Sequence, residues 1–241
     1  MSILKLRRVG CQLIDRDRRF ELCLEALDVE PGSRVAIVGP SGCGKTTLLE
    51  LFALLRQHTH ADKFFVSTTS NKIVDINSQW QEGRMDALRL IRAKYCGYIP
   101  SGGGLFPALS IRENTRLRAH IAGIREAAAN KAIERLSDVL VLSNDDLDAP
   151  LTLLSRGQQI RGAILHGLVH KPRLVIADEP TSALHPSLAM SVMRMLVKEV
   201  LSADGAIVVS THDVKLVEDL GFTMVRGIAD TNCSTNRTLF R

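Results

Sequence analysis

The sequence predicts an α/β fold in which a parallel β-sheet is flanked by helices. Three short apolar runs, typical of buried strands, lie at residues 34–38, 173–177 and 206–210. Segments with the three- and four-residue spacing of a helix separate these runs. Strands that alternate with helices in this way favour a parallel sheet, because each crossover connection has room for a helix.

The helical patterns and the remaining segments complete one predicted domain over residues 1–241. Helices are predicted at 45 to about 56, 126–141, about 157–169 and 187–201. Residues 1–38 alternate apolar and polar side chains as strands do, and about 102–160 is predicted to form a helical lobe. Residues 57–85 are polar without a clear period, which predicts an extended variable segment, either an enlarged β-rich lobe or a flexible loop.

The amino-acid composition excludes few functions, but it limits the compartment in which the protein is expected to act. The 241 residues are 45% hydrophobic and 24% charged, with a net charge of +5 whose basic residues are mostly scattered. Aromatic residues make up 4%, which argues against stacking platforms for single-stranded nucleic acid. Five widely spaced cysteines without a CxxC pair favour a reducing compartment over a disulfide framework or a zinc site. The sequence contains neither a signal-peptide pattern nor an apolar run near the roughly 20 residues of a membrane span. Any function at a membrane is therefore expected to require a partner protein.

A glycine-rich turn after the first strand is the strongest motif of the chain. Residues 39–46 match G-x-x-x-x-G-K-[ST] without a mismatch, between a predicted strand and a predicted helix. Glycines let successive N–H groups turn towards an anion, and the helix start adds unpaired donors. Lys45 would contact the β- and γ-phosphates, and the Thr46 hydroxyl would ligate Mg²⁺. The predicted ATP-binding residues are Gly39, Pro40, Ser41, Gly42, Cys43, Gly44, Lys45, Thr46 and Thr47.

Two carboxylates follow the second apolar run. Asp178 and Glu179 stand at its end, and ligands bind at that end of strands in open parallel sheets. Asp178 would hold Mg²⁺ together with Thr46, while Glu179 would orient or deprotonate the attacking water. A strand that simply leaves the core for a polar turn is the alternative, and the glycine-rich turn upstream makes it less favoured.

Four further segments complete a family resemblance. Residues 154–161 (LSRGQQIR) resemble the LSGGQ signature of ABC ATPases, and 177–184 (ADEPTSAL) continue in that family's order. Thr211-His212-Asp213 resembles its switch histidine, and 105–107 with 112–114 resembles the segment after its glutamine loop. The resemblance extends from about Ile3 to Val225, and it implies a P-loop NTPase of the ABC type with an antiparallel β lobe beside the helical lobe.

The resemblance also implies how such a chain works. Two ATPase subunits, most simply a homodimer, would pack head to tail, so that ATP on one P-loop meets the other subunit's signature residues Ser155, Gly157 and Gln158. His212 would position the water of the catalytic Glu179, and the D-loop would lie at the seam. The D-loop residues are Ser182, Ala183, Leu184 and His185. Separate permease-type membrane subunits would dock around 101–113. The chain would then lie in the cytoplasm, peripheral on the inner (plasma) membrane. The resemblance implies ATP and Mg²⁺ as cofactors and no nucleic acid partner.

The sequence departs from that family at four places. Ser101 stands where the glutamine loop carries Gln, and it could reach Mg²⁺ only through a water. His185 replaces the D-loop Asp, and Arg156 replaces the first glycine of the signature. No aromatic stands at the position that stacks on adenine, which leaves Phe20 or an Arg16 guanidinium as candidates.

The function predicted is that of an ATP-hydrolysing subunit, most similar to the lipoprotein-releasing and macrolide-efflux type, which powers export or transmits mechanical force. Ser101 and His185 motivate one alternative, an ATP-gated regulatory module with slow or no turnover. An ABC ATPase acting on DNA or ribosomes is a second alternative, disfavoured by the single P-loop and the lack of a sustained heptad pattern. A P-loop kinase is the weakest, because it does not explain the signature.

Overall fold

The computed structural model describes residues 1–15, 18–69, 72–230 and 236–241, and a ten-stranded sheet runs through it. The strand order is β5-β4-β1-β2-β10-β9-β3-β8-β7-β6. The core strands are β3 (Arg34–Val38), β6 (Cys96–Ile99), β7 (Leu174–Asp178), β8 (Ala206–Ser210) and β9 (Thr223–Asp230), and neighbouring core strands pair in parallel. The predicted α/β class with a parallel core sheet is therefore confirmed, as are the three predicted apolar strands.

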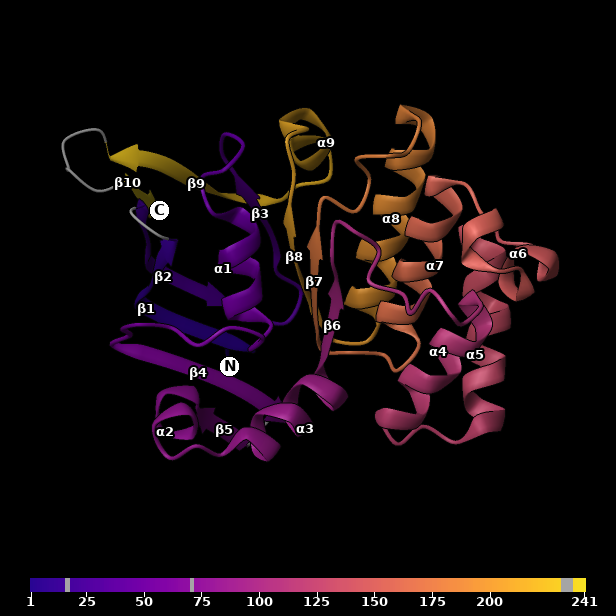
Figure 1. Cartoon of the computed structure of the whole chain (residues 1–241), viewed down its shortest axis with the longest axis horizontal. Helices are drawn as coiled ribbons and strands as arrows, with labels where there is room; N and C mark the ends of the chain where they lie inside the picture. Colours follow the sequence, from indigo (N-terminus) through magenta and orange to yellow (C-terminus); the bar gives the residue numbers. More distant parts are fainter. Residues whose placement is uncertain (16–17, 70–71, 231–235) are drawn as a thin grey trace.

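An antiparallel β lobe adjoins this core on the left of Figure 1. It consists of β1 (Leu4–Asp15), β2 (Arg18–Val29), β4 (Lys63–Thr69) and β5 (Lys72–Asp75). The final strand, β10 (Asn236–Phe240), pairs in parallel with β2 and antiparallel with β9, so it joins the lobe to the core. Both chain termini lie on this side of the molecule.

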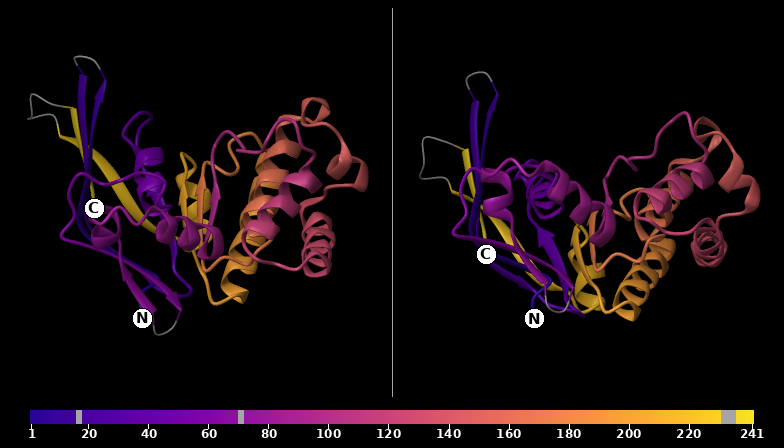
Figure 2. Two further views of the ribbon diagram at one scale, coloured as in Figure 1. Left: turned by 60° about the horizontal axis from the view of Figure 1, so that its bottom comes forward. Right: turned by 90° about the horizontal axis from the view of Figure 1, so that it is seen from below.

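Helices cover both faces of the parallel strands. The helices that follow the P-loop and precede β6 are α1 (Lys45–Phe52), α2 (Ile76–Gln81) and α3 (Met85–Tyr95). The other face carries α7 (Arg156–Leu168) and α8 (Pro186–Ser202), while α9 (Val214–Asp219) precedes β9. A helical lobe projects beyond α7 and α8 (Figures 1 and 2), and it contains α4 (Ile111–Ile121), α5 (Glu126–Leu140), α6 (Asn144–Asp148) and the 3₁₀ turn η1 (Leu151–Leu153).

The pleat of the core strands divides the apolar interior into two clusters. In β7, Val175 and Ala177 pack with the helices of the α7–α8 face, whereas Leu174 and Ile176 pack with α1 and the β lobe. Both faces are buried, which explains why the strands are continuous apolar runs in the sequence. No helix among the described residues has the length and apolar character needed to cross a membrane.

One predicted helix differs from the observed element. The first helix ends at Phe52 rather than near residue 56, because Leu54 adopts a left-handed backbone (φ 57°) and the Leu55 N–H turns back to the Glu50 carbonyl. Residues 57–85, for which the sequence left open an enlarged β-rich lobe or a flexible loop, contain β4, β5 and α2. Phe64 and Val66 are both buried in β4, so a short alternation is present within that polar stretch. The four described cysteines are free and buried, while Cys233 lies outside the described residues.

Arg118 fastens the helical lobe to the core. Its guanidinium donates to the Cys96 carbonyl (2.7 Å) and the Arg92 carbonyl (3.2 Å), and it lies 2.8 Å from His170 Nε2. Burial, aided by the charge of Arg118, lowers the pKa of His170 to about 3 and of His166 to about 4. Both imidazoles are therefore neutral in the folded protein at neutral pH.

The two buried histidines predict that the protein becomes less stable as the pH falls. Between the unfolded pKa near 6.5 and the folded values, the unfolded chain binds more protons, so stability falls as pH falls through this window. His170→Gln should therefore weaken the pH dependence of urea unfolding midpoints between pH 7.5 and 5. His120→Gln, at an exposed site on α4, is the matched control and should leave that dependence unchanged. Equal pH dependence in wild type and His170→Gln would contradict the assignment.

Candidate functional site

The P-loop lies between β3 and α1 and contains two left-handed glycines. Gly42 (φ 76°) and Gly44 (φ 93°) adopt backbone angles that other residues rarely tolerate, and Gly44 caps the N-terminus of α1. A Cβ on Gly44 would approach the Phe20 ring to 3.0 Å, so space as well as conformation requires glycine. The φ values agree with the prediction that glycines in this turn allow backbone angles that other residues rarely adopt.

Lys45 lies almost fully buried beneath this loop. Its Nζ donates to the Gly39 and Pro40 carbonyls, at 3.0 Å each, and lies 3.4 Å from His212 Nε2. These carbonyls fix the position of the ammonium within the loop that is predicted to bind phosphate.

Asp178 and Thr46 lie together at the end of β7. The Thr46 hydroxyl donates to Asp178 Oδ2 at 2.8 Å, and Ser210 Oγ donates to the other carboxylate oxygen. Asp178 is 2% exposed, so both oxygens of a buried carboxylate are satisfied by hydroxyls. A hydroxyl and a carboxylate are hard oxygen ligands of the kind Mg²⁺ prefers, so the two predicted metal residues fit that ion. Sequence reasoning missed Ser210, although it is the one polar residue of an otherwise apolar strand.

The Glu179 and His212 side chains are in contact next to this carboxylate. His212 Nε2 lies 2.7 Å from Glu179 Oε1. Glu179 has a left-handed backbone (φ 48°), and its N–H is fixed by the Ser210 carbonyl (3.2 Å) and hydroxyl (3.0 Å). The strained angle directs the glutamate side chain away from the strand path, a feature common at functional sites.

Six of the nine predicted ATP-binding residues and both predicted catalytic residues line one cavity of about 450 Å³. Gly39, Pro40 and Cys43 are not among its described lining residues. Its lining combines P-loop residues with Glu179 and His212, and Phe20 and Leu13 close one side with apolar surface. Phe20, one of the two candidates for stacking on adenine, thus lines the P-loop cavity. The alternative candidate, Arg16, lies outside the described residues.

The predicted signature residues open α7, away from that cavity. Ser155 caps the helix by accepting from the Gln158 N–H (3.3 Å), and Gln158 Oε1 accepts from the Ser155 N–H (2.8 Å). Gly157 adjoins the D-loop, since a Cβ there would lie 3.4 Å from Leu184 Cδ2. Within the described part of the chain, Ser155, Gly157 and Gln158 are not among the residues that line the P-loop cavity.

The D-loop is attached to the catalytic segment. The Ser182 hydroxyl and N–H both donate to the Glu179 carbonyl, at 3.1 and 3.2 Å, and the Leu184 N–H donates to the Thr181 carbonyl at 3.0 Å. His185 precedes α8, with Nδ1 2.9 Å from the Ser187 hydroxyl. Its imidazole therefore stands in place of a carboxylate beside the start of α8.

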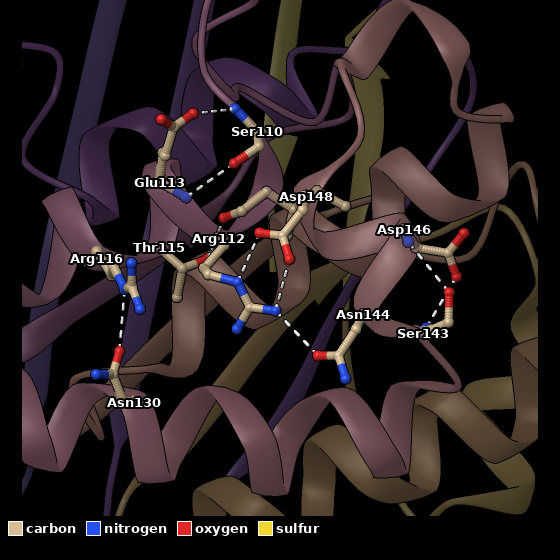
Figure 3. Close-up of polar contacts among 11 residues, drawn as sticks. Ser110, Arg112, Glu113, Thr115, Arg116, Asn130, Ser143, Asn144, Asp146 and Asp148 are labelled. Atoms are coloured by element: carbon tan, nitrogen blue, oxygen red, sulfur yellow. Dashed lines mark hydrogen bonds and ion pairs between the residues drawn. The ribbon is translucent and has the colours of Figure 1, made fainter.

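A polar network supports the signature from within the helical lobe (Figure 3). Arg112 on α4 makes a bidentate contact with Asp148 (2.7 and 3.0 Å) and reaches Asn144 (3.0 Å). Asp146, on the same short helix as these two residues, accepts from Gln158 Nε2 at 2.6 Å. The start of α4 is thereby linked through α6 to the signature turn.

Asn114 anchors the segment that leads into α4. Its side chain is 1% exposed, and its Oδ1 accepts from the Phe106 N–H at 2.8 Å. The two hydrogens on Nδ2 are shared among the Phe106, Leu109 and Ser110 carbonyls, so this one amide fixes residues 106–110. The sequence marked Asn114 by resemblance alone, and its anchoring role comes only from the structure.

A second cavity, of about 310 Å³, lies between the core and the helical lobe. Arg89, Arg92 and Arg118 line it, and none of the described residues around it is acidic. Burial lowers the pKa of the Arg92 and Arg118 guanidinium groups, and their hydrogen bonds go to backbone carbonyls and His170. Leu55 and Ile121, both more than half exposed, add apolar surface at its rim.

The fold and the P-loop cavity define a nucleotide-binding ATPase of the P-loop class. The family model described as "ABC transporter" matches residues 25–182. The chain therefore belongs to the ABC transporter family of ATP-binding proteins, and the predicted family and ATPase class are confirmed.

Similar proteins support the same assignment. The lipoprotein-releasing system ATP-binding protein LolD of Hyphomonas neptunium is 31% identical over 217 residues, which cover 87% of this chain and 90% of that protein. LolD 1 of Rhodospirillum rubrum is 33% identical over 191 residues, or 79% of each chain. The solved dimeric structure of the ATP-binding cassette MJ0796, described as a post-hydrolysis state bound to ADP and Pi, superposes with a TM-score of 0.81 at 26% identity, covering 92% of this chain and 93% of that one.

Replacing the buried ammonium predicts a direct loss of nucleotide affinity. Lys45→Ala should weaken ATP binding by roughly 10- to 100-fold, because a charge-assisted contact to phosphate is removed. Isothermal titration calorimetry would measure it, with Lys131→Ala on exposed α5 as the control that keeps wild-type affinity. Undiminished ATP binding by Lys45→Ala would place the triphosphate elsewhere.

Proposed function

We propose that this chain dimerises on ATP, hydrolyses it and thereby drives separate membrane subunits in export or in transmission of mechanical force. The observation that carries the proposal is the division of the predicted site. One cavity contains the P-loop, Glu179 and His212, while the signature turn lies outside it. A second copy of the chain can supply that turn, and most simply the dimer consists of two identical chains.

The chemistry proposed for one cavity starts from the contacts already described. P-loop amides and Lys45 bind the β- and γ-phosphates, and the Ser155 hydroxyl with the Gly157 amide of the second copy donates to the γ-phosphate. Glu179 orients and deprotonates the attacking water, and His212, 2.7 Å from it, keeps that carboxylate in place. Thr46 and Asp178 would hold Mg²⁺, which supplies positive charge against the phosphates.

Phe20 is proposed to contact the adenine, because its ring closes the P-loop cavity beside Gly44. The whole chain, residues 1–241, would act as one ATPase domain, with the helical lobe at about 102–160 and a variable segment at 57–85. The lobe carries both the signature and the segment 101–113, so a partner bound there would influence the second copy's ATP.

The partner is proposed to be an integral membrane protein that holds the chain peripherally on the cytoplasmic face of the inner membrane. Relatives named as lipoprotein-releasing ATP-binding proteins support this assignment. The cavity between core and lobe is the proposed docking site. Its three guanidinium groups, and the absence of an acidic residue among the described lining, favour a partner segment that carries Asp or Glu.

The rate of ATP hydrolysis distinguishes this proposal from the alternative, an ATP-gated regulatory module with slow or no hydrolysis. Glu179→Gln should reduce steady-state ATP hydrolysis by about a hundredfold or more while ATP binding persists, since the general base is lost and the phosphate contacts remain. Phosphate release and calorimetry on the same samples would measure both. Wild-type protein that binds ATP without measurable turnover, or turnover unchanged in Glu179→Gln, would favour the regulatory module.

Charge reversal in the docking cavity predicts loss of the membrane partner. Arg89→Glu changes an exposed cavity residue, whereas Arg125→Glu changes an exposed arginine at the start of α5, outside the cavity lining. The membrane protein recovered with the wild-type chain should decrease several-fold with Arg89→Glu and stay constant with Arg125→Glu. Quantitative mass spectrometry of the purified complexes measures this ratio. Equal recovery with both variants would exclude the cavity as an acidic docking site.

A further inference from the structure

Arg156 reaches from the start of α7 to the loop that follows β6. Its Nη2 donates to the Ser101 carbonyl at 2.8 Å and its Nη1 to the Gly102 carbonyl at 3.2 Å. The signature of the family has glycine in this place, and glycine has no side chain that could make either contact. The two hydrogen bonds therefore join the glutamine-loop position to the signature turn of the same chain.

Among the described residues, the rest of that loop makes few hydrogen bonds, although Leu105 packs against the apolar cluster of the α7–α8 face. Ile99 pairs with Ala177 in the sheet, and Asn114 fixes the backbone of Phe106 on the far side. Between them, Gly103 (φ 87°) and Gly104 (φ 66°) have left-handed backbones. A single backbone turn, from the Gly103 N–H to the Pro100 carbonyl at 2.9 Å, is the internal hydrogen bond among the described loop residues.

Ser101 does not replace the missing glutamine. Its side chain is short and exposed, and it is absent from the described residues that line the P-loop cavity. The fixed part of the loop at this position is its backbone, through the carbonyls that Arg156 binds. A planar guanidinium donates to two successive carbonyls through two separate nitrogens in a fixed geometry, whereas a lysine ammonium has to donate to both from one nitrogen.

We propose that Arg156 is a positioning residue that holds the loop 100–104 against the start of α7, and that this backbone contact couples the loop to the signature where a glutamine would couple it through Mg²⁺ or water. The inference rests on the proposed function, because Pro100, Gly103 and Gly104 also line the docking cavity. Movement of a docked partner would be passed through the loop and Arg156 to Ser155, the preceding residue of the signature.

Hydrogen exchange of the nucleotide-free chain tests the contact itself. In Arg156→Ala, the Gly103 amide, which donates to the Pro100 carbonyl, should exchange about five- to tenfold faster than in wild type, because the charge-assisted bonds that hold this turn are lost. Arg156→Lys should give an intermediate rate, and Arg125→Ala should match wild type. A Gly103 amide that exchanges equally fast in wild type and Arg156→Ala would overturn the proposal. No nucleotide or partner enters this measurement, so its failure leaves the proposed function standing.

A double-variant cycle tests the substitution for glutamine. Arg156→Gly should lower kcat for ATP about fivefold with little change in KM, and adding Ser101→Gln should restore most of the lost rate. A purely structural effect of Arg156 on α7 would not be relieved by a change at residue 101, so additive losses in the double variant would overturn this part of the proposal. Melting temperatures of the four proteins identify any variant that fails to fold.

Discussion

The carboxylate of Asp178 joins the P-loop helix to two neighbouring strands at the edge where the ligand cavity opens. It ends β7, accepts from Thr46 at the start of α1, and accepts from Ser210 at the end of β8. A buried carboxylate is tolerated only when its oxygens are satisfied, and here both partners are hydroxyls from elements that contribute to the site. Ser210 also fixes the Glu179 N–H, so the same interaction sets the backbone of the proposed catalytic base. The relative positions of the residues proposed to bind phosphate, to hold the metal and to activate water therefore depend on the hydrogen bonds of Asp178.

The second constraint is that the two parts of the proposed site do not meet within one chain. The P-loop cavity and the signature turn are held by separate networks, one around Asp178 and the other from Arg112 through α6 to Gln158. Each network is satisfied internally, which allows the two parts to approach across a dimer as preformed surfaces. The contacts of the Arg118 guanidinium with the Cys96 carbonyl and His170 fix where the helical lobe meets the core. A partner that docks there would therefore act on both networks.

Sequence reasoning succeeded where the information is local. The P-loop follows from glycine positions within eight residues, and the core strands follow from uninterrupted apolar runs that are buried on both faces. The contact of Arg156 with Ser101 spans 55 positions, and that of Arg118 with His170 spans 52, so no spacing rule could identify them. The end of α1 at Phe52 depends on a left-handed Leu54, a conformation that leucine does not signal. Ser210 was overlooked because a serine at a strand end is common, and its partner is specified only by the sheet.

The departures from the family pattern are unevenly distributed over these networks. P-loop, Asp178, Glu179 and His212 match the pattern and lie together, whereas Ser101, Arg156 and His185 lie on the loop, the signature turn and the D-loop. Phosphate binding requires fixed donors in a geometry set by the ligand, which leaves little freedom for substitution. Contacts that transmit movement need only join two segments, so different side chains can provide them. A guanidinium bound to the loop backbone can thus stand in for a glutamine side chain, provided that the joined segments still move together.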